Sequence, residues 1–432
     1  MKAYLECHPW IGAAGMFVLA TLICWLRMGS QERDTLWEED GSVFTGDWLH
    51  RPSPWLIVTP YAGYVNLIPR VTQLIVQLMP VKYWALLTTA AACVVVGLVC
   101  GLAYYCSRWT LTMWSARFGL VLVPALLPLA GVEPLGTVCN LHWWAIFAVF
   151  WLIMARPKGR FDMIVLALLA FAFTMSEIMV VFVLPLALWR IFRPEVARQR
   201  VVSIVVSVGC VWQVVAYLVV GRAPESSVVT PLTVAVKGWL VNVIGGSVTS
   251  SLGLVQTILA TAGWQAFIVA LLFFLVPIVL ALQLSSSRGR RLMIAYNLVL
   301  SVVLWFFILY MNGYPNGLYS SGVVDVMLRW GMAASLCLLT AYLLAIDELV
   351  TRRTLSLRLA TLTIALLIAV QSTSFTTVND NRAAGLQWQL NVEIAQGQCR
   401  EGATEIAMFQ HPPFWGLPGW EQFVVPCDRL LR

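Results

Sequence analysis

Charged residues are scarce in this chain. Of its 432 residues, 11% are charged and 60% are hydrophobic, and the mean hydropathy is +0.80. A soluble domain carries about 25% charged residues, so the composition excludes an ordinary soluble protein. The apolar runs are long enough to cross a hydrocarbon core as helices, and they lack the alternation that a transmembrane β-barrel requires. The sequence therefore predicts an all-α polytopic membrane protein.

Signals for metal binding and for processing are also missing. The four histidines and ten cysteines show no paired zinc-ligand spacing, and no internal repeat or low-complexity tract stands out. Only Lys2 provides an early basic residue before the first apolar run, and no small-residue cleavage site precedes Arg27. We therefore expect this run to be a retained membrane anchor and not a cleaved signal peptide.

The apolar runs predict about eleven transmembrane helices. The third is short and is interrupted by Pro124 and Pro128. On this division, residues 1–372 form a transmembrane domain and residues 373–432 form an extracytoplasmic tail. The predicted spans are 10–27, 83–105, 118–131, 141–155, 161–175, 177–191, 201–219, 265–283, 292–311, 330–346 and 358–372.

Basic residues fall in alternate connections between these spans, and those five connections are short. The positive-inside rule makes such connections cytoplasmic. The N-terminus is then cytoplasmic and the C-terminus lies outside, as in a multi-pass protein of the bacterial inner membrane. Because this topology accounts for the net charge of +7, the charge does not indicate nucleic acid. The basic residues of the five short connections are Arg108, Arg117, Arg156, Lys158, Arg160, Arg190, Arg193, Arg198, Arg200, Arg288, Arg290, Arg291, Arg352, Arg353 and Arg358.

Three long segments are predicted to lie outside, and loops of such length are usually functional. The first of them packs five carboxylates into residues 32–40, directly after the first span. Apolar residues at helical spacing over residues 71–79 then predict an amphipathic helix in the membrane interface. Acidic residues followed by an interfacial helix are typical of an active site at the membrane surface. The three segments are 28–82, 220–264 and 373–432, and the helical spacing is that of Val71, Leu74, Ile75 and Leu78.

Four short motifs lie in the first part of the chain: Glu39-Asp40-Gly41, Gly63-Tyr64, Pro69-Arg70 and Asn140-Leu141-His142-Trp143. In this order they resemble polytopic glycosyltransferases of the GT-C fold, especially little-characterised bacterial members. The resemblance covers roughly the first 200 residues, and only the layout is similar afterwards. It implies a sugar donor on polyprenyl phosphate, an acidic residue of the first outer loop as catalytic base, and a glycan, lipid or protein acceptor in the cell envelope.

Asp40 is the predicted base, with Glu39 as the second choice. Transfer from a lipid phosphate needs a carboxylate that takes the proton of the acceptor hydroxyl while the sugar gains positive charge. Gly41 follows Asp40 and would let the backbone approach a sugar closely. The alternative is that these carboxylates form the solvated acidic N-terminus of an interfacial helix, where the helix dipole favours them.

The departing phosphate needs cations or polar donors, and Arg70, Tyr64, His142 and Asn140 are the candidates. Arg70 has the alternative of reaching the lipid headgroups from an interfacial helix. His142 has the alternative of a packed, hydrogen-bonded role. All four lie in segments where the predicted outer face meets the membrane.

Glu177 and Arg329 are further candidates for substrate binding at the outer face. A tight turn would also solvate Glu177, and Arg329 has the alternative of an interface anchor. No residue is assigned to a metal, although clustered carboxylates could hold one divalent cation such as Mg²⁺ or Mn²⁺.

Cys399 and Cys427 lie in the predicted outer tail, where thiols oxidise. A disulfide between them would enclose residues 403–419 and make the tail a small cap over the outer face. Cys139, also near that face, is the alternative partner.

Two other classes of function compete with a transferase. A flippase or ion-coupled carrier marks its path with ionisable residues inside its spans, and the centres of these spans are nearly free of charge. A non-catalytic envelope-assembly protein is the third possibility. Substituting Asp40 discriminates them, because only a transferase would lose a product.

Overall fold

The computed structural model describes residues 8–37, 39–221, 231–312, 329–376, 380–412 and 423–432. Every one of the predicted spans is helical, with ends within a few residues of those expected. The third begins earlier than predicted, at Trp114, and Pro124 lies inside it. The prediction of an all-α chain with the helices of a membrane protein is therefore confirmed.

Seven helical segments of the described residues are long and apolar enough to cross a membrane. The other predicted spans fall in shorter helices, so a count of eleven crossings is not established. The seven segments are Pro9–Arg27, Val81–Ser107, Trp114–Val132, Gln199–Val220, Gln265–Leu284, Arg288–Met311 and Arg329–Thr351. The shorter helices are α8 (His142–Met154), α9 (Arg160–Thr174), α10 (Leu184–Phe192), which follows the 3-10 turn η6 (Ile178–Val183), and α17 (Leu357–Ser372).

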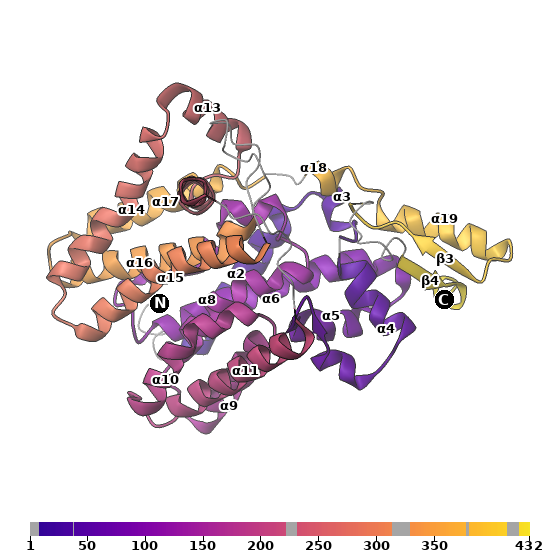
Figure 1. The fold of residues 1–432 in the computed structure, drawn as a ribbon, viewed down its shortest axis with the longest axis horizontal. Coiled ribbons are helices and arrows are strands. Elements are labelled where there is room, and N and C mark those ends of the chain that lie inside the picture. The colour runs from indigo at the N-terminus through magenta and orange to yellow at the C-terminus, as the bar shows by residue number, and fades with distance from the viewer. Residues whose placement is uncertain (1–7, 38, 222–230, 313–328, 377–379, 413–422) are drawn as a thin grey trace.

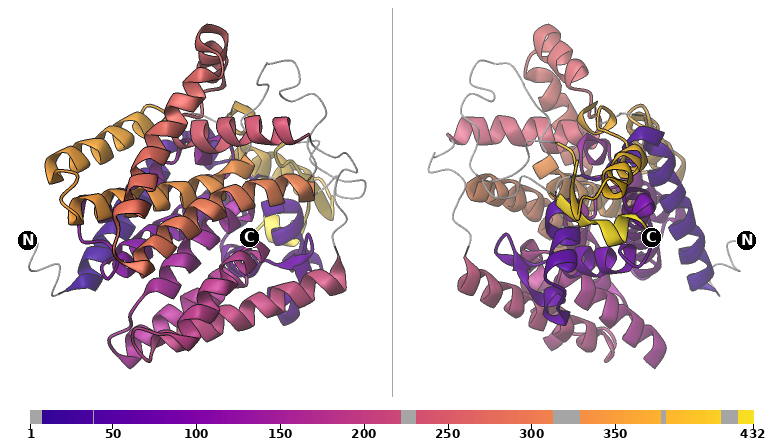
Figure 2. Two further views of the ribbon diagram at one scale, coloured as in Figure 1. Left: turned by 60° about the vertical axis from the view of Figure 1, so that its left-hand side comes forward. Right: turned by 90° about the vertical axis from the view of Figure 1, so that its right-hand side faces the viewer.

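Several of the long helices, among them α6, α15 and α16, lie roughly along the long axis of the molecule, whereas α14 crosses it steeply (Figure 1); Figure 2 shows the bundle from two further sides. Two elements form the centre of the core. Helix α8 is buried over nearly its whole length, and 94% of the most apolar 18-residue stretch of the Arg329–Thr351 segment is buried. Close approach of α2 to α6 depends on Gly97, where a Cβ atom would lie 2.8 Å from the Phe17 carbonyl. The long helices are α2 (Pro9–Arg27), α6 (Trp84–Ser107), α7 (Trp114–Leu126), α11 (Gln199–Val220), α14 (Gln265–Leu284), α15 (Arg288–Asn312) and α16 (Met332–Thr351).

The connections between helices gather at two opposite ends of the bundle. At the end that we call the basic end, the predicted cytoplasmic connections contact one another: Arg290 donates to the Thr110 carbonyl, and Arg198 donates to the Lys158 carbonyl at 3.1 Å. At the other end, which we call the cap end, the Trp388 N–H donates to the Asp34 carbonyl at 2.6 Å. These contacts bring predicted cytoplasmic connections together at one end and two of the predicted outer segments together at the other.

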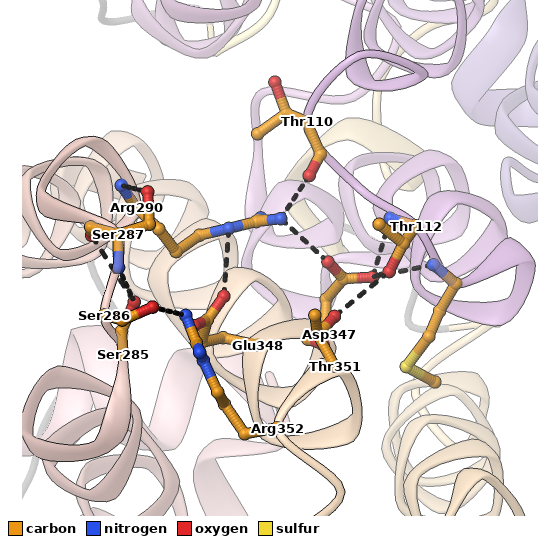
Figure 3. A network of polar contacts seen from close by, with 11 residues as sticks. Thr110, Thr112, Ser285, Ser286, Ser287, Arg290, Asp347, Glu348, Thr351 and Arg352 are labelled. Carbon is orange, nitrogen blue, oxygen red and sulfur yellow. Dashed lines mark hydrogen bonds and ion pairs between the residues drawn. The ribbon is translucent and has the colours of Figure 1, made fainter.

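Asp347 ties three helices together at the basic end (Figure 3). Its carboxylate, fully buried, accepts the N–H groups of Thr112 and Met113 at 2.9 and 2.7 Å, next to the start of α7. It also accepts from Arg290 of α15 at 3.0 Å. Glu348 lies 3.5 Å from the same arginine and 2.9 Å from Arg352. The predicted span 330–346 stopped one residue short of this network.

We expect Asp347→Asn to destabilise the chain by about 1–3 kcal/mol, because an amide cannot accept all of these hydrogen bonds and leaves buried donors unpaired. Thermal unfolding of the purified protein in detergent measures the loss. Asp428→Asn makes the same chemical change at an exposed carboxylate and should leave stability within about 0.5 kcal/mol of the native chain. Equal effects of the two substitutions would contradict the role of the network.

Short elements fill the first predicted outer segment at the cap end. They are α3 (Ser30–Arg33), η1 (Asp40–Thr45), α4 (Gly46–His50), η2 (Pro54–Val58), the hairpin β1 (Pro60–Tyr61) and β2 (Tyr64–Val65), α5 (Leu67–Val76) and η3 (Val81–Tyr83). The expected amphipathic helix is α5, and it begins four residues before residue 71. Pro69 fits because it lies in the first turn, where no intrahelical N–H bond is lost.

The polar side of α5 faces the protein and its apolar side faces outward. Gln73 donates to the Thr88 hydroxyl at 3.1 Å, and Gln77 donates to the Thr45 carbonyl at 2.8 Å. Ile75 is 55% exposed and Leu78 is 76% exposed. A soluble domain buries the opposite side of such a helix, so this arrangement supports contact of α5 with lipid.

The tail forms a small unit on the first outer segment. Its elements are α18 (Asp380–Ala383), α19 (Trp388–Arg400), β3 (Glu405–Met408), β4 (Phe423–Pro426) and α20 (Cys427–Leu430), with β3 and β4 antiparallel. Trp388 and Phe423 pack against Trp84 in one hydrophobic cluster. The remaining short elements are η4 (Pro128–Val132), η5 (Cys139–Leu141), α12 (Leu232–Trp239), η7 (Leu240–Ile244), η8 (Gly245–Ser247), α13 (Leu252–Ala262) and η9 (Arg329–Gly331).

The predicted disulfide between Cys399 and Cys427 is present, with Cα atoms 5.5 Å apart. Cys139, the alternative partner, is buried outside this bond. The bond joins the end of α19 to the start of α20, so it closes the unit around β3 and β4. Of the enclosed loop, residues 413–422 lie outside the described part of the chain.

Removing this bond with Cys399→Ser and Cys427→Ser should lower the stability of the tail by about 3–4 kcal/mol, because the unfolded segment regains the freedom of a loop of this length. Limited proteolysis followed by mass spectrometry should show faster cleavage within residues 388–432. A reducing agent should reproduce the effect in the native chain and add nothing in the double variant. Unchanged cleavage would contradict the expectation.

Candidate functional site

A histidine–carboxylate pair lies at the cap end, where α8 begins. His142 Nδ1 donates to the Glu177 carboxylate. The second oxygen of Glu177 accepts the Met179 N–H at 2.7 Å, which caps η6. The side chain of His142 is 13% exposed, whereas that of Glu177 is 2% exposed. Glu177 is therefore not a solvated turn residue but the group that fixes the orientation of the imidazole.

Glu39 directly precedes η1 and is half-buried. The Tyr61 hydroxyl donates to its carboxylate at 3.3 Å. Burial, and after it the Glu39 charge, raises the pKa of Tyr61 well above its usual range, so the phenol stays protonated and serves as a donor.

The β1–β2 hairpin connects the Glu39–Tyr61 contact with the His142–Glu177 pair. Tyr61 pairs with Tyr64 across the hairpin, and the Tyr64 ring lies 6.1 Å from the His142 ring. The tight turn places Gly63 at φ 86° and Ala62 at φ 53°, so the second turn position suits glycine. Tyr61 was missed in the sequence, although it belongs to the same Pro60–Tyr64 stretch that identified Tyr64.

Asp40, the predicted base, is 1% exposed. Its two carboxylate oxygens accept the N–H groups of Val138 at 2.9 Å and Cys139 at 2.6 Å. These donors lie at the start of η5, which leads directly into α8, so Asp40 anchors the element that carries His142. Of the two adjacent carboxylates, only Glu39 has an exposed surface.

Burial raises the pKa of Asp40 to about 7, while the N–H groups of Val138 and Cys139 and the charge of Arg382 act in the opposite direction. The pKa of an unfolded aspartate is about 3.9. The folded chain therefore binds this proton more tightly, and Asp40 contributes stability at low pH that is lost as the pH rises from about 4 to about 7.

The stability advantage of the native chain over Asp40→Asn should consequently shrink between about pH 4 and about pH 7. Thermal unfolding of both proteins in one detergent, measured across this range, gives the difference. Asp428→Asn, at an exposed carboxylate, serves as the reference variant. A difference that does not change with pH would contradict the raised pKa of Asp40.

Arg70 lies buried and does not extend from α5 to the lipid headgroups. Its guanidinium is paired with Asp47 at 2.5 Å and lies over the Phe44 ring at 5.3 Å. Asp47 is partly exposed, and no sequence spacing would have paired it with Arg70. The Trp48 indole donates to the Arg70 carbonyl at 2.9 Å, which fixes α4 against α5.

The remaining predicted residues lie near the site but have local partners. Asn140 donates to the Thr137 hydroxyl at 3.0 Å and accepts from the Trp143 indole at 3.1 Å. Arg329 forms an ion pair with Glu133. The structure therefore places Glu39, Tyr64, His142 and Glu177 in one region and gives Asn140 and Arg329 contacts of their own.

Arg382 is the residue that joins the tail to the site, and sequence reasoning missed it. It is 2% exposed and donates to the carbonyls of Glu32 at 2.8 Å, Leu135 at 3.2 Å and Gly136 at 3.2 Å. Burial lowers the pKa of Arg382, and the charges of Asp40 and Glu32 oppose this. The guanidinium of Arg382 thus joins the tail to two segments that are far from it in sequence, at residue 32 and at residues 135–136.

The described residues contain no group of three or more His, Cys, Asp or Glu side chains arranged to hold a metal ion. What the cap end offers is a half-buried carboxylate with a phenol donor and, across the β1–β2 hairpin, a histidine whose Nδ1 is held by a carboxylate. Such a set can accept a proton from one group and donate hydrogen bonds to another. Comparison of the chain with protein-family models, curated proteins and solved structures finds no match.

Proposed function

We propose that this chain is a membrane glycosyltransferase that moves a sugar from a polyprenyl-phosphate carrier to a cell-envelope acceptor outside the cytoplasm. One observation carries the proposal. The half-buried Glu39 accepts from Tyr61, and the hairpin that carries Tyr61 brings Tyr64 to the ring of His142, which is paired with Glu177. GT-C-like architecture and about eleven crossings are part of the same proposal.

In the proposed reaction, Glu39 takes the proton of the acceptor hydroxyl, and the acceptor oxygen attacks the anomeric carbon of the sugar. The bond from that carbon to the phosphate oxygen breaks, and the polyprenyl phosphate leaves with the electron pair. In its doubly protonated form His142 donates from Nδ1 to Glu177 and from Nε2 to the departing phosphate. Asp40 is a positioning residue, since it holds the start of η5.

The exposed apolar side of α5 supports delivery of the donor from the membrane. Leu78 and Ile75 face outward on the segment that carries Arg70 and Tyr64. A polyprenyl chain lying in the bilayer would bring its phosphate to the headgroup level, where the cap end begins. Arg70 enters this proposal as a support for Asp47 and not as a direct contact to phosphate.

We propose that the protein lies in the bacterial inner membrane with its basic end in the cytoplasm. The fifteen basic residues of the five short connections support this orientation. The Cys399–Cys427 bond in the cap supports it independently, because disulfides persist in oxidising compartments such as the periplasm.

The test is purified protein in liposomes, supplied with a panel of polyprenyl-phosphate sugars and cell-envelope acceptors. Transfer from at least one donor is expected. No transfer from any donor, together with unchanged envelope glycans in a deletion strain, would contradict the proposal. If instead a labelled lipid-linked sugar crosses the bilayer unchanged, the chain is a flippase.

A further inference from the structure

A hollow of about 990 Å³ opens at the basic end, far from the proposed site. It lies between the end of α10 and the turn that joins α14 to α15. Arg193 directly follows α10, and Arg288 and Arg291 belong to the first turn of α15. All three arginines are exposed, so their guanidinium groups surround the opening with positive charge.

No carboxylate of the described residues pairs with these three arginines. Neighbouring arginines at the same end are neutralised: Arg190 by Glu195 at 2.5 Å, and Arg290 by Asp347 at 3.0 Å. The first N–H groups of α15 add a partial positive charge to the same place. The hollow is therefore a concentrated cationic site whose counter-charge the described part of the protein does not supply.

The rest of the lining is apolar. Trp189, Leu282 and Leu292 belong to it, and the surface continues over exposed apolar side chains: Phe192 is 78% exposed and Leu284 is 45% exposed. A free phosphate would use only the arginines. A phospholipid would use both parts, with its phosphate among the guanidinium groups and its acyl chains along α10 and α14.

We propose that this hollow binds the headgroup of an anionic phospholipid, and that the lipid holds α10 against the α14–α15 turn. The three charges favour an anionic headgroup over a zwitterionic one, whose own cation would meet the arginines. With the basic end in the cytoplasm, the lipid belongs to the cytoplasmic leaflet. This site is independent of the transfer reaction proposed for the cap end.

The test uses the full chain, delipidated in a neutral detergent and titrated with phosphatidylglycerol or with phosphatidylcholine of the same acyl chains. Native mass spectrometry counts the bound lipid. We expect phosphatidylglycerol to bind the native chain, and the triple variant R193Q/R288Q/R291Q to bind it about 100-fold more weakly. Ala295→Phe fills the hollow and keeps every charge, and it should also lose the lipid.

The matched control is R160Q/R200Q/R358Q, which removes three charges from exposed arginines of the same end outside the hollow. This variant should bind phosphatidylglycerol as the native chain does. The proposal is overturned if the control loses as much binding as the hollow variant, or if phosphatidylcholine binds as well as phosphatidylglycerol. Displacement of the lipid by millimolar inorganic phosphate would also overturn it, because the site would then take a free phosphate.

Discussion

Replacing Glu39 with glutamine is expected to lower sugar transfer by about 10²–10⁴-fold, the contribution of a positioned general base. The amide keeps the size of the side chain and can still accept the hydrogen bond from Tyr61, so the fold should not change. It cannot take a proton from the acceptor hydroxyl. Initial rates in liposomes measure the loss, and donor binding should change far less than turnover.

Two variants make this result interpretable. Glu393→Gln makes the same change at an exposed position of α19 and should keep full activity. Asp40→Asn, at the buried neighbour, should alter the start of η5 and therefore show a change in unfolding along with any change in rate. If Glu39→Gln is active and a fully folded Asp40→Asn is not, Asp40 is the base and the assignment of Glu39 is wrong.

Arg382→Met is expected to destabilise the cap end by about 3–5 kcal/mol, the usual cost of breaking a buried charged network. The carbonyls of Glu32, Leu135 and Gly136 would all lose a donor in a place that water does not reach. The tail should then detach from the first outer segment. Hydrogen exchange should show this as faster exchange in α19 and in residues 34–37, with the basic end unchanged.

Arg400→Met is the matched control, because Arg400 is exposed at the end of α19 in the same tail. It should leave exchange and unfolding as in the native chain. Arg382→Lys keeps the charge but offers fewer donors in a different geometry, so it should fall between the native chain and Arg382→Met. If Arg382→Met unfolds like the native chain, the guanidinium does not hold the tail.

The helices could be predicted because the signal for each is local. An apolar run of the right length marks a spanning helix whatever it packs against, and runs such as 10–27 and 83–105 correspond to α2 and α6. The disulfide was predictable for a similar reason, since the tail holds only two cysteines. The end of span 330–346 was placed too early because hydropathy counts Asp347 as exposed, whereas its partners make it a buried residue.

The arrangement of the site could be predicted only in part. Acidic residues after the first span and His142 at the start of α8 were visible as motifs. The partners of these side chains, however, depend on which backbone groups the fold brings next to them. Asp40 meets Cys139 across 99 residues, and Arg382 meets Glu32 across 350 residues. No local pattern encodes such contacts, and a buried arginine in a polar tail looks like any other tail residue until the fold is known.

The way in which Arg382 and Trp388 hold residues 32–36 has a consequence for biogenesis. A ribosome finishes residues 30–90 long before it makes residues 380–430, so the first outer segment waits in the membrane without its covering partner. During that interval Leu36 and Trp84, each almost fully buried in the finished protein, have nothing to cover them. Assembly of the cap end therefore waits until residues 380–430 are made, and a quality-control factor that recognises exposed apolar surface could act on the chain until then.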